Sequence, residues 1–319
     1  MAGDAPFFIV GSGRSGTTLL RLILTGHSRL HIPPETWFIQ TLVQELPLSE
    51  PLTPAQVEYA VGIITGNYRW PDMELAAEDL RASAQALASP RLADVINLVY
   101  RTLCARAGKP RFGDKTPAYI SIVPQLVTLY PDARFIHLIR DGRDVAMSWI
   151  DLKYERYYET KGFEWVTVMR HRAKLLRGPL AGRVLEVKYE DLVIDPKPTV
   201  QRICSFLGER FEPDMLRLDG KAALVPPRER HIHRGLNRPV SSDGVAAWRR
   251  RLTAAECFAM ESVLHHDLRA LGYPLRFSAA AWRPLLDVTG CLLRLGAPLL
   301  GKAIPALQRR GLLPARMYI

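Results

Sequence analysis

Short runs of apolar residues, typical of buried strands, alternate along this chain with segments whose apolar residues recur at helical spacing. The first run covers residues 7–10, a second covers 134–139 and a looser third covers 184–189, and each leads into a helical segment. Strands that alternate with helices in this way favour a parallel sheet. The pattern therefore predicts an α/β fold in which a central parallel sheet is flanked by helices.

Prolines and glycines divide the rest of the pattern into further elements. After a first helix over residues 17–26, Pro33 and Pro34 precede a helix that is predicted to begin at Glu35. Residues 50–108 read as several short helices, and they belong to a predicted helical insertion over residues 36–108. The remaining expected elements are a short strand over residues 111–117 and helices over residues 118–130, 165–176, 191–208 and 254–271.

These elements fall within a predicted domain of residues 1–275, and residues 276–319 differ from it in composition. Residues 280–319 are rich in Leu, Ala, Gly and Pro, and their charged residues are almost all basic: Arg283, Arg294, Lys302, Arg309, Arg310 and Arg316 stand against Asp287. We expect a basic amphipathic helical extension. Such a segment can lie on an anionic membrane surface, or pack on the body of the protein or on a second subunit of a homodimer.

The net charge of +11 favours an anionic partner, which could be nucleic acid, a membrane surface or a polyanionic small molecule. A solvated arginine-rich surface would give the same charge. The four cysteines are far apart and form no C-x-x-C pair, which is typical of reduced thiols in a cytosolic protein. No signal peptide and no run of about 18 apolar residues is evident. The expected location is cytoplasmic, with peripheral membrane contact left open.

The first strand leads into a glycine-rich turn, Gly11-Ser12-Gly13-Arg14-Ser15-Gly16-Thr17-Thr18. Glycines let the backbone approach an anion closely, and the N–H groups at the start of the following helix point at it. The turn nearly matches the nucleotide-binding pattern G-x-x-x-x-G-K-[ST], but Thr17 replaces the lysine. The strong cation of this turn is Arg14. A tight strand-to-helix connection without a ligand would also need such glycines.

A second polar strand end follows residues 134–139, where Arg140-Asp141-Gly142-Arg143-Asp144 leads into a helix. Ligands of open parallel sheets bind at the edge where the strands' carboxyl ends meet. The two polar turns are therefore expected to face one ligand.

Three motifs together resemble the sulfotransferases that use 3′-phosphoadenosine 5′-phosphosulfate (PAPS). Residues 13–19 are similar to the family's 5′-phosphosulfate loop, in the arginine-containing branch that includes tyrosylprotein sulfotransferases and many bacterial members. Residues 140–148 are similar to its 3′-phosphate motif, and residues 187–192 to its third signature. The resemblance covers residues 5–275 and implies a three-layer fold like that of the P-loop nucleotide kinases.

The resemblance also implies roles for individual residues. Glu35 lies 21 residues after Arg14 and matches the position of the family's general base, although an acid at a helix start can simply favour the helix dipole. Arg14 would stabilise the leaving phosphate. The implied cofactor contacts are Gly13, Arg14, Ser15, Gly16, Thr17, Thr18, Arg140 and Ser148 at the phosphates, Tyr189 near the adenine and Arg238 closing over the nucleotide. Two roles stay open: Lys115, in a turn that recurs in the family, could instead pair with Asp114, and Arg143 could contact phosphate or form a surface salt bridge.

We therefore expect a transferase that moves a sulfuryl group from PAPS to a hydroxyl acceptor, leaving 3′-phosphoadenosine 5′-phosphate (PAP). The acceptor would be a lipid, glycolipid, phenolic compound or carbohydrate. No metal is expected, and His27, His31 and His137 form no metal-ligand set. One alternative is a P-loop kinase or NTPase, which requires a lysine at position 17. The other is a basic protein that binds nucleic acid or a membrane surface, which would favour arginines interleaved with aromatic residues.

Overall fold

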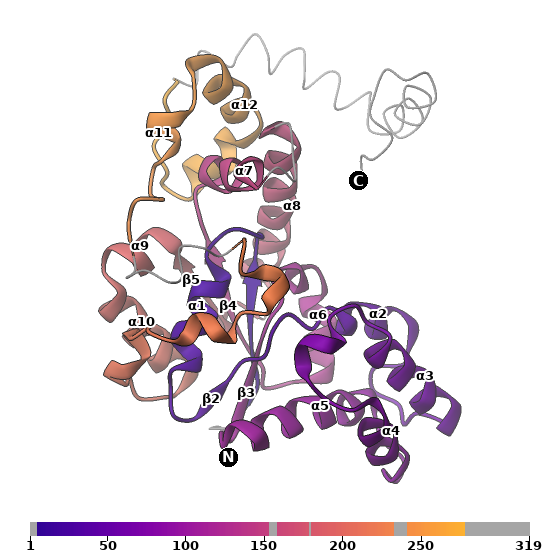
Figure 1. Cartoon of the computed structure of the whole chain (residues 1–319). Coiled ribbons are helices and arrows are strands. Elements are labelled where there is room, and N and C mark those ends of the chain that lie inside the picture. Colours follow the sequence, from indigo (N-terminus) through magenta and orange to yellow (C-terminus); the bar gives the residue numbers. More distant parts are fainter. Residues whose placement is uncertain (1–4, 153–157, 179, 233–240, 278–319) are drawn as a thin grey trace, which may run out of the picture. The chain divides into compact units, whose positions relative to one another are not determined.

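The computed structural model describes residues 5–152, 158–178, 180–232 and 241–277 (Figure 1). The chain separates into two compact units, Met1–Arg251 and Leu252–Ile319. The predicted division at residue 275 stays a prediction. The predicted extension lies almost entirely outside the described residues.

A five-stranded parallel sheet forms the centre of the first unit, in the order β2-β3-β1-β4-β5. Its strands are β1 (Phe7–Gly11), β2 (Leu30–His31), β3 (Arg111–Lys115), β4 (Arg134–Ile139) and β5 (Val184–Lys188). Ile9 of β1 lies opposite Lys115 on one side and Ile136 on the other. The carboxyl ends of β1, β3 and β4 therefore meet at one edge. The predicted parallel α/β fold is confirmed; only the two-residue strand β2 was not foreseen.

Each face of the sheet is covered by a separate apolar cluster, because successive side chains of a strand point to opposite faces. Phe7 and Ile9 pack with α1 (Thr17–Thr25), α10 (Pro196–Leu207) and the segment after it. Phe8 and Val10 pack with α2 (Phe38–Glu45), α3 (Pro54–Thr65), α4 (Ala77–Gln85), α5 (Leu92–Ala107) and α6 (Val123–Leu129). Figure 1 shows the same three layers, with α1, α9 (Tyr189–Ile194) and α10 on one side of the strands and α2–α6 on the other.

The helical insertion has the predicted short helices, and their ends follow from local sequence. Thr53 caps α3, since its hydroxyl accepts the N–H of Gln56 while the Gln56 side chain accepts the N–H of Thr53, and Pro54 takes the first helical position. The 3-10 helix η1 (Trp70–Met73) contains Pro71. Helix α5 ends at Gly108, whose φ of 62° lies in the left-handed region.

The second helix does not begin at Glu35 as predicted. It begins at Phe38, because two long-range contacts hold the chain in a turn before it. The Thr36 N–H donates to Thr116 Oγ1 at 3.1 Å, and the Thr36 hydroxyl donates to Asp114 Oδ2 at 2.8 Å. The next residue, Trp37, has a left-handed φ of 56°. Glu35 therefore lies in a loop, so the alternative in which it serves a helix dipole is wrong.

Other element boundaries differ in smaller ways. Residues 117–129 form a 3-10 helix, η2 (Pro117–Ile122), followed by α6, rather than one continuous helix. Helix α8 (Tyr158–Arg177) begins before the predicted residue 165. Tyr189 opens α9 instead of ending β5, and α9 and α10 are separate because Pro196 starts the second. Helix α7 (Gly142–Asp151) follows β4 as predicted.

The described part of the second unit is organised around α12 (Ala254–Ala270), as the sequence predicts. Thr253 and Glu256 form a capping box at its start. Glu261 is buried and accepts the backbone N–H groups of Arg276 and Phe277, which holds the chain after the helix against it.

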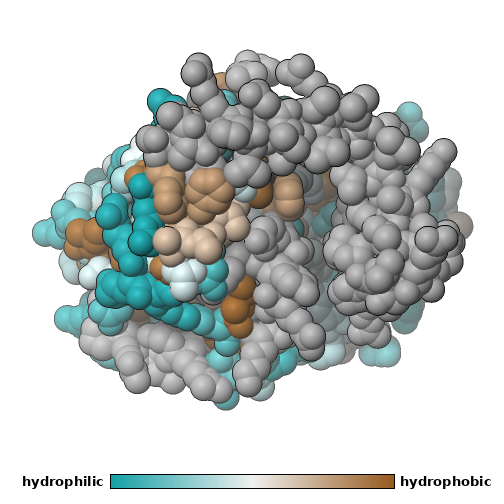
Figure 2. Space-filling model, turned by 90° about the horizontal axis from the view of Figure 1, so that it is seen from above, coloured by the Kyte–Doolittle hydropathy of each residue, from teal (hydrophilic) through white to brown (hydrophobic). Residues whose placement is uncertain are grey.

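On the face shown in Figure 2, small hydrophobic patches lie next to hydrophilic residues. The large apolar side chains exposed in the described part of the chain are Tyr59, Tyr68, Phe163, Ile194 and Leu224. A search of the described helices found none with the length and hydropathy needed to cross a bilayer.

Candidate active site

The turn between β1 and α1 is built as a cradle. Arg14 and Gly16 both have left-handed backbone angles, with φ of 66° and 90°. A Cβ on Gly16 would lie 2.4 Å from Cδ2 of Tyr189, so this position also requires glycine because the aromatic ring is close. No side chain caps the start of α1, and the buried Ser15 Oγ has no hydrogen-bond partner in the described part of the chain. The N-terminal N–H groups and this hydroxyl suit an anion.

Arg14 links the cradle to the second predicted motif. Its Nε donates to Ser148 Oγ on α7 at 3.0 Å, and its Nη2 donates to the backbone oxygen of Ile232 at 3.2 Å. Because β1 and β4 are neighbours in the sheet, the turns that follow them are brought side by side. The first two predicted phosphate motifs therefore form one site.

Arg140, directly after β4, lies against the same cradle. Its Nη1 donates to the Arg14 carbonyl at 3.0 Å, its Nη2 donates to the Gly244 carbonyl at 2.9 Å, and its guanidinium lies over the Tyr189 ring at 4.4 Å. The buried Arg140 Nε has no partner among the described residues. Tyr189 thus reaches both Gly16 and Arg140. Arg238, the remaining predicted contact, lies outside the described residues.

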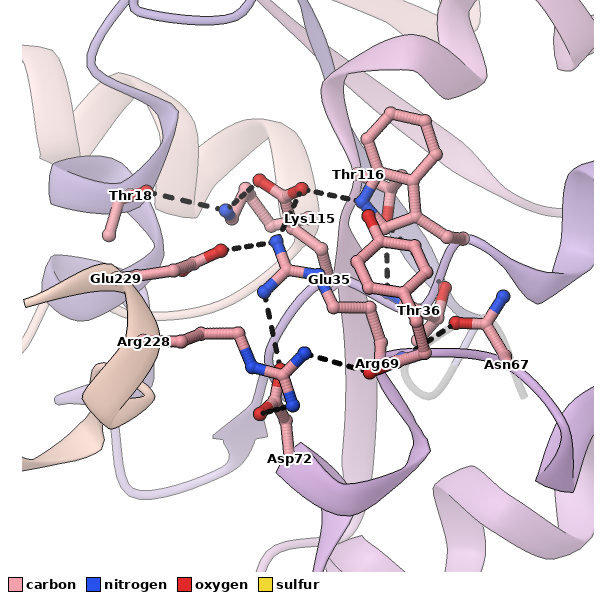
Figure 3. Close-up of polar contacts among 12 residues, drawn as sticks. Thr18, Glu35, Thr36, Asn67, Arg69, Asp72, Lys115, Thr116, Arg228 and Glu229 are labelled. Atoms are coloured by element: carbon pink, nitrogen blue, oxygen red, sulfur yellow. Dashed lines mark hydrogen bonds and ion pairs between the residues drawn. The ribbon is translucent and has the colours of Figure 1, made fainter. Parts of the chain in front are cut away.

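Glu35 is held by three donors at the other side of the cradle. Lys115 Nζ donates to its Oε1 at 2.5 Å, and Trp37 Nε1 and Arg69 Nη2 donate to its Oε2 at 2.7 and 3.3 Å (Figure 3). Burial by itself would raise the pKa of this carboxyl, but the Lys115 and Arg69 charges and the hydrogen bonds outweigh it and lower the pKa. Glu35 is therefore ionised and able to accept a proton.

Lys115 joins this carboxylate to the cradle. It ends β3, beside β1, and its Nζ contacts Glu35 and also Thr18 Oγ1 at 3.3 Å. Its side chain is only 2% exposed. The sequence left the role of Lys115 open, and its contact with Glu35 was not foreseen.

Sequence reasoning missed the arginine on the far side of Glu35. Arg69, in the loop after α3, also donates to Glu229 from the 3-10 helix η6 (Pro227–Glu229) and to Asp72 at 3.2 Å. Arg228 pairs with the same Asp72 at 2.9 Å (Figure 3). An arginine in an apolar insertion, between Tyr68 and Trp70, was the available signal, because arginine is seldom buried unless it is paired.

A second buried network, also missed from the sequence, supports the turn that carries Glu35. Tyr100 and Thr36 donate from their hydroxyls to Asp114 Oδ2 at 2.7 and 2.8 Å, and the Tyr119 hydroxyl accepts the N–H of Ile39 at 3.1 Å. Burial raises the pKa of Asp114 to about 6, despite these hydrogen bonds. The network connects the start of α2 to the end of β3.

Arg143, whose role the sequence left open, is fully buried, and its described contacts hold it in the fold. Its Nη2 donates to Asp141 at 2.7 Å, and its guanidinium lies 3.6 Å from the centre of the Trp248 ring. It is therefore not a surface salt bridge. His27 bonds to the Arg210 carbonyl and His137 to Glu186, in different places. No group of three potential metal ligands was found in the described ranges, and the absence of a metal requirement stays a prediction.

The described site thus combines a parallel α/β sheet, a glycine-rich turn after its central strand and a buried carboxylate joined to that turn through Lys115, an arrangement typical of proteins that bind an anionic ligand at the carboxyl ends of the strands. The sulfotransferase family model matches residues 6–213, so the chain belongs to the sulfotransferase family.

The chain is also similar to individual proteins. An uncharacterized protein of Aquifex aeolicus is 26% identical over 260 residues, which are 77% of this chain but only 30% of that protein. A putative protein-tyrosine sulfotransferase of Caenorhabditis briggsae is 27% identical over 66% of this chain and 67% of its own length. The sulfotransferase domain of the Synechococcus PCC 7002 olefin synthase is 26% identical, with a TM-score of 0.61, and the match covers 86% of this chain and 96% of that domain.

Proposed function

We propose that this protein transfers a sulfuryl group from PAPS to a hydroxyl acceptor, with Glu35 as the general base. The observation that carries the proposal is the position of Lys115, which contacts the ionised Glu35 and Thr18 of the cradle at the same time. A base and a phosphate cradle separated by one lysine side chain suit a reaction in which an acceptor is deprotonated beside an anionic leaving group.

The described residues fit a nucleotide with phosphates at both ends of its ribose. The cradle offers the N–H groups of Gly16–Thr18 at the start of α1 and the Ser15 hydroxyl, which lacks a partner in the described part of the chain. The second phosphate would bind Arg140, whose Nε lacks a hydrogen-bond partner within the same ranges, and Ser148. Tyr189 would face the adenine, and Arg238 would close over the nucleotide. When bound, PAPS supplies the sulfuryl group.

Residues of the chain then account for the charge changes of the transfer. Glu35 accepts the hydroxyl proton of the acceptor while the acceptor oxygen forms a bond to sulfur. Arg14 and the cradle N–H groups stabilise the electron pair that stays on the phosphate oxygen when the sulfur–oxygen bond breaks; losing one such donor typically costs about 3 kcal/mol. Arginine acts here through charge and hydrogen bonds, since it does not give up its proton.

The proposed acceptor is a lipid, glycolipid, phenolic compound or carbohydrate, and aromatic residues near Glu35 favour the less polar members of this group. Trp37 contacts Glu35 directly, and Tyr68 lies beside Arg69 with 59% of its surface exposed. The direct experiment offers the enzyme ³⁵S-labelled PAPS and a cell extract. Label in an organic-soluble hydroxyl compound supports the proposal, and label in polysaccharide alone would contradict the preference for a less polar acceptor. No transfer to any acceptor would contradict the activity itself.

A further inference from the structure

One guanidinium nitrogen of Arg69 is shared by two carboxylates. Nη2 donates to Glu35 Oε2 at 3.3 Å and, more closely, to Glu229 Oε1, while Nη1 donates to Asp72 Oδ2 at 3.2 Å (Figure 3). The Arg69 side chain is 8% exposed, and that of Glu229 is 11% exposed. Because Glu229 accepts a hydrogen bond from the same nitrogen that donates to Glu35, it restricts the position of the Arg69 guanidinium beside Glu35.

Glu229 belongs to a short segment, residues 227–232, that contacts both halves of the site; we call it the strap. Arg228 anchors it to the insertion, donating to the Tyr68 carbonyl at 2.8 Å and pairing with Asp72 at 2.9 Å. At its other end the Ile232 carbonyl accepts from Arg14 Nη2 at 3.2 Å. The strap therefore contacts the cradle arginine and the arginine that holds the base.

We propose that Arg69 and Glu229 are a positioning pair, in which Glu229 of the strap holds Arg69 against Glu35 and so fixes the orientation and basicity of that carboxylate. The proposal rests on the role of Glu35 given above. Neither residue contacts the cradle in the described structure, so their effect on the reaction passes through Glu35.

The charges around Glu35 give the pair a distinctive signature. Lys115 from β3, Arg69 from the loop after α3 and Arg21 from α1 are the cations that face it. Glu229 from η6 and Asp72 from η1 are anions that face the same cluster. Removing the Arg69 charge should raise the pKa of Glu35. Removing the Glu229 charge should lower it or leave it unchanged, because a repelling charge is lost while Arg69 keeps its contacts with Glu35 and Asp72.

The test is the titration of Glu35 in the intact protein, followed by ¹³C NMR of its side-chain carboxyl carbon and assigned by its loss in Glu35→Gln. Arg69→Gln is expected to raise the midpoint by roughly one pH unit. Arg69→Lys should restore most of the difference, and Glu229→Gln should not raise the midpoint. The matched control is Glu58→Gln, which breaks an exposed ion pair between Glu58 and Arg81. It should leave the Glu35 midpoint unchanged.

Kinetics provide the second readout. Arg69→Gln should lower the kcat of transfer about tenfold or more while PAP affinity stays within about twofold, since positioned proton transfer is worth roughly 10²–10⁴ in rate. A Glu35 midpoint that does not rise in Arg69→Gln, or that rises in Glu229→Gln, in protein whose thermal unfolding shows it to be folded, would overturn the proposed pair. If the variants show the expected midpoints but the wild-type protein transfers no sulfuryl group, the proposed function is contradicted and the pairing stays intact.

Discussion

Arg14 Nε donates a hydrogen bond to Ser148 Oγ at 3.0 Å, across 134 positions of sequence. Each side chain comes from a different motif, the first after β1 and the second on α7. We expect each to bind a different phosphate of one nucleotide. Their direct contact means that both phosphate sites lie within reach of one small ligand, which neither motif shows by itself.

The first prediction concerns this second phosphate site. PAP should raise the melting temperature without Mg²⁺, and ADP, which lacks a 3′-phosphate, should raise it much less. Ser148→Ala should weaken PAP binding by about 10- to 100-fold, because a hydrogen bond to a charged group is worth about 1.5–3 kcal/mol. Isothermal titration calorimetry measures both affinities.

The control for this experiment is Ser262→Ala, which removes a hydroxyl that bonds within α12, in the other unit. It should leave PAP binding unchanged. Equal responses of the wild-type protein to PAP and ADP would contradict the assignment of Arg140 and Ser148 to a 3′-phosphate.

The sequence predicted those parts of the site whose residues form a recognisable motif within a short stretch of chain. The glycines and the missing lysine identify the cradle between residues 11 and 18, and an apolar run ending in Arg140 identifies a strand end at a sheet edge. Parallel strand order then brings such turns together. That is why Arg14, Arg140 and Tyr189 meet as the motifs imply.

The remaining contacts depend on pairings between distant segments, which no local pattern records. Arg69 meets Glu229 across 160 positions, and Thr36 meets Asp114 across 78. The start of α2 was misplaced for the same reason. Prolines before Glu35 favour a helix there, but buried contacts of Thr36 with Asp114 of β3 and Tyr119 of η2 hold a turn instead.

A second prediction tests the close approach of backbone to ring in the cradle. Gly16→Ala should both destabilise the protein and abolish PAP binding. The alanine would have to adopt a φ of 90°, and its Cβ would overlap the Tyr189 ring. Two other glycines separate these causes. Gly108 has a φ of 62° but open space around its Cβ, and Gly182 has open space without a positive φ.

Chemical denaturation of the three alanine variants measures the difference. Gly182→Ala should be neutral, Gly108→Ala should cost about 1 kcal/mol, and Gly16→Ala should cost more than that. If Gly16→Ala matched Gly108→Ala and still bound PAP, the Tyr189 ring could not be packed against the cradle as described.

The third prediction concerns the base. Glu35→Gln keeps the size of the side chain and its acceptor oxygen but removes the site that takes the proton. PAP affinity should stay within a few-fold of wild type, while transfer from PAPS should fall by about 10²–10⁴. The control is Glu45→Gln, an exposed carboxylate at the end of α2 that accepts from Tyr59. Unchanged turnover in Glu35→Gln would remove Glu35 as the base.

The fourth prediction concerns pH and the buried carboxyl beneath the base. Burial raises the pKa of Asp114 from 3.8 in the unfolded chain to about 6 in the fold, so the folded protein binds more protons between these values. Its contribution to stability is therefore present below pH 4 and is lost as the pH rises to about 6. Asp114→Asn stays neutral and should remove this loss, which is roughly 2–3 kcal/mol.

Urea denaturation of wild type and variant from pH 4 to pH 7 measures the difference in slope. Asp144, whose pKa burial also raises to about 6, contributes to the wild-type curve in the same window, so only the difference between the two proteins belongs to Asp114. Asp79→Asn, an exposed change on α4, should follow the wild-type curve. Parallel curves for wild type and Asp114→Asn would mean that Asp114 is ionised throughout. The hydroxyls of Tyr100 and Thr36, which both donate to its Oδ2, would then be enough to stabilise a buried charge behind Glu35.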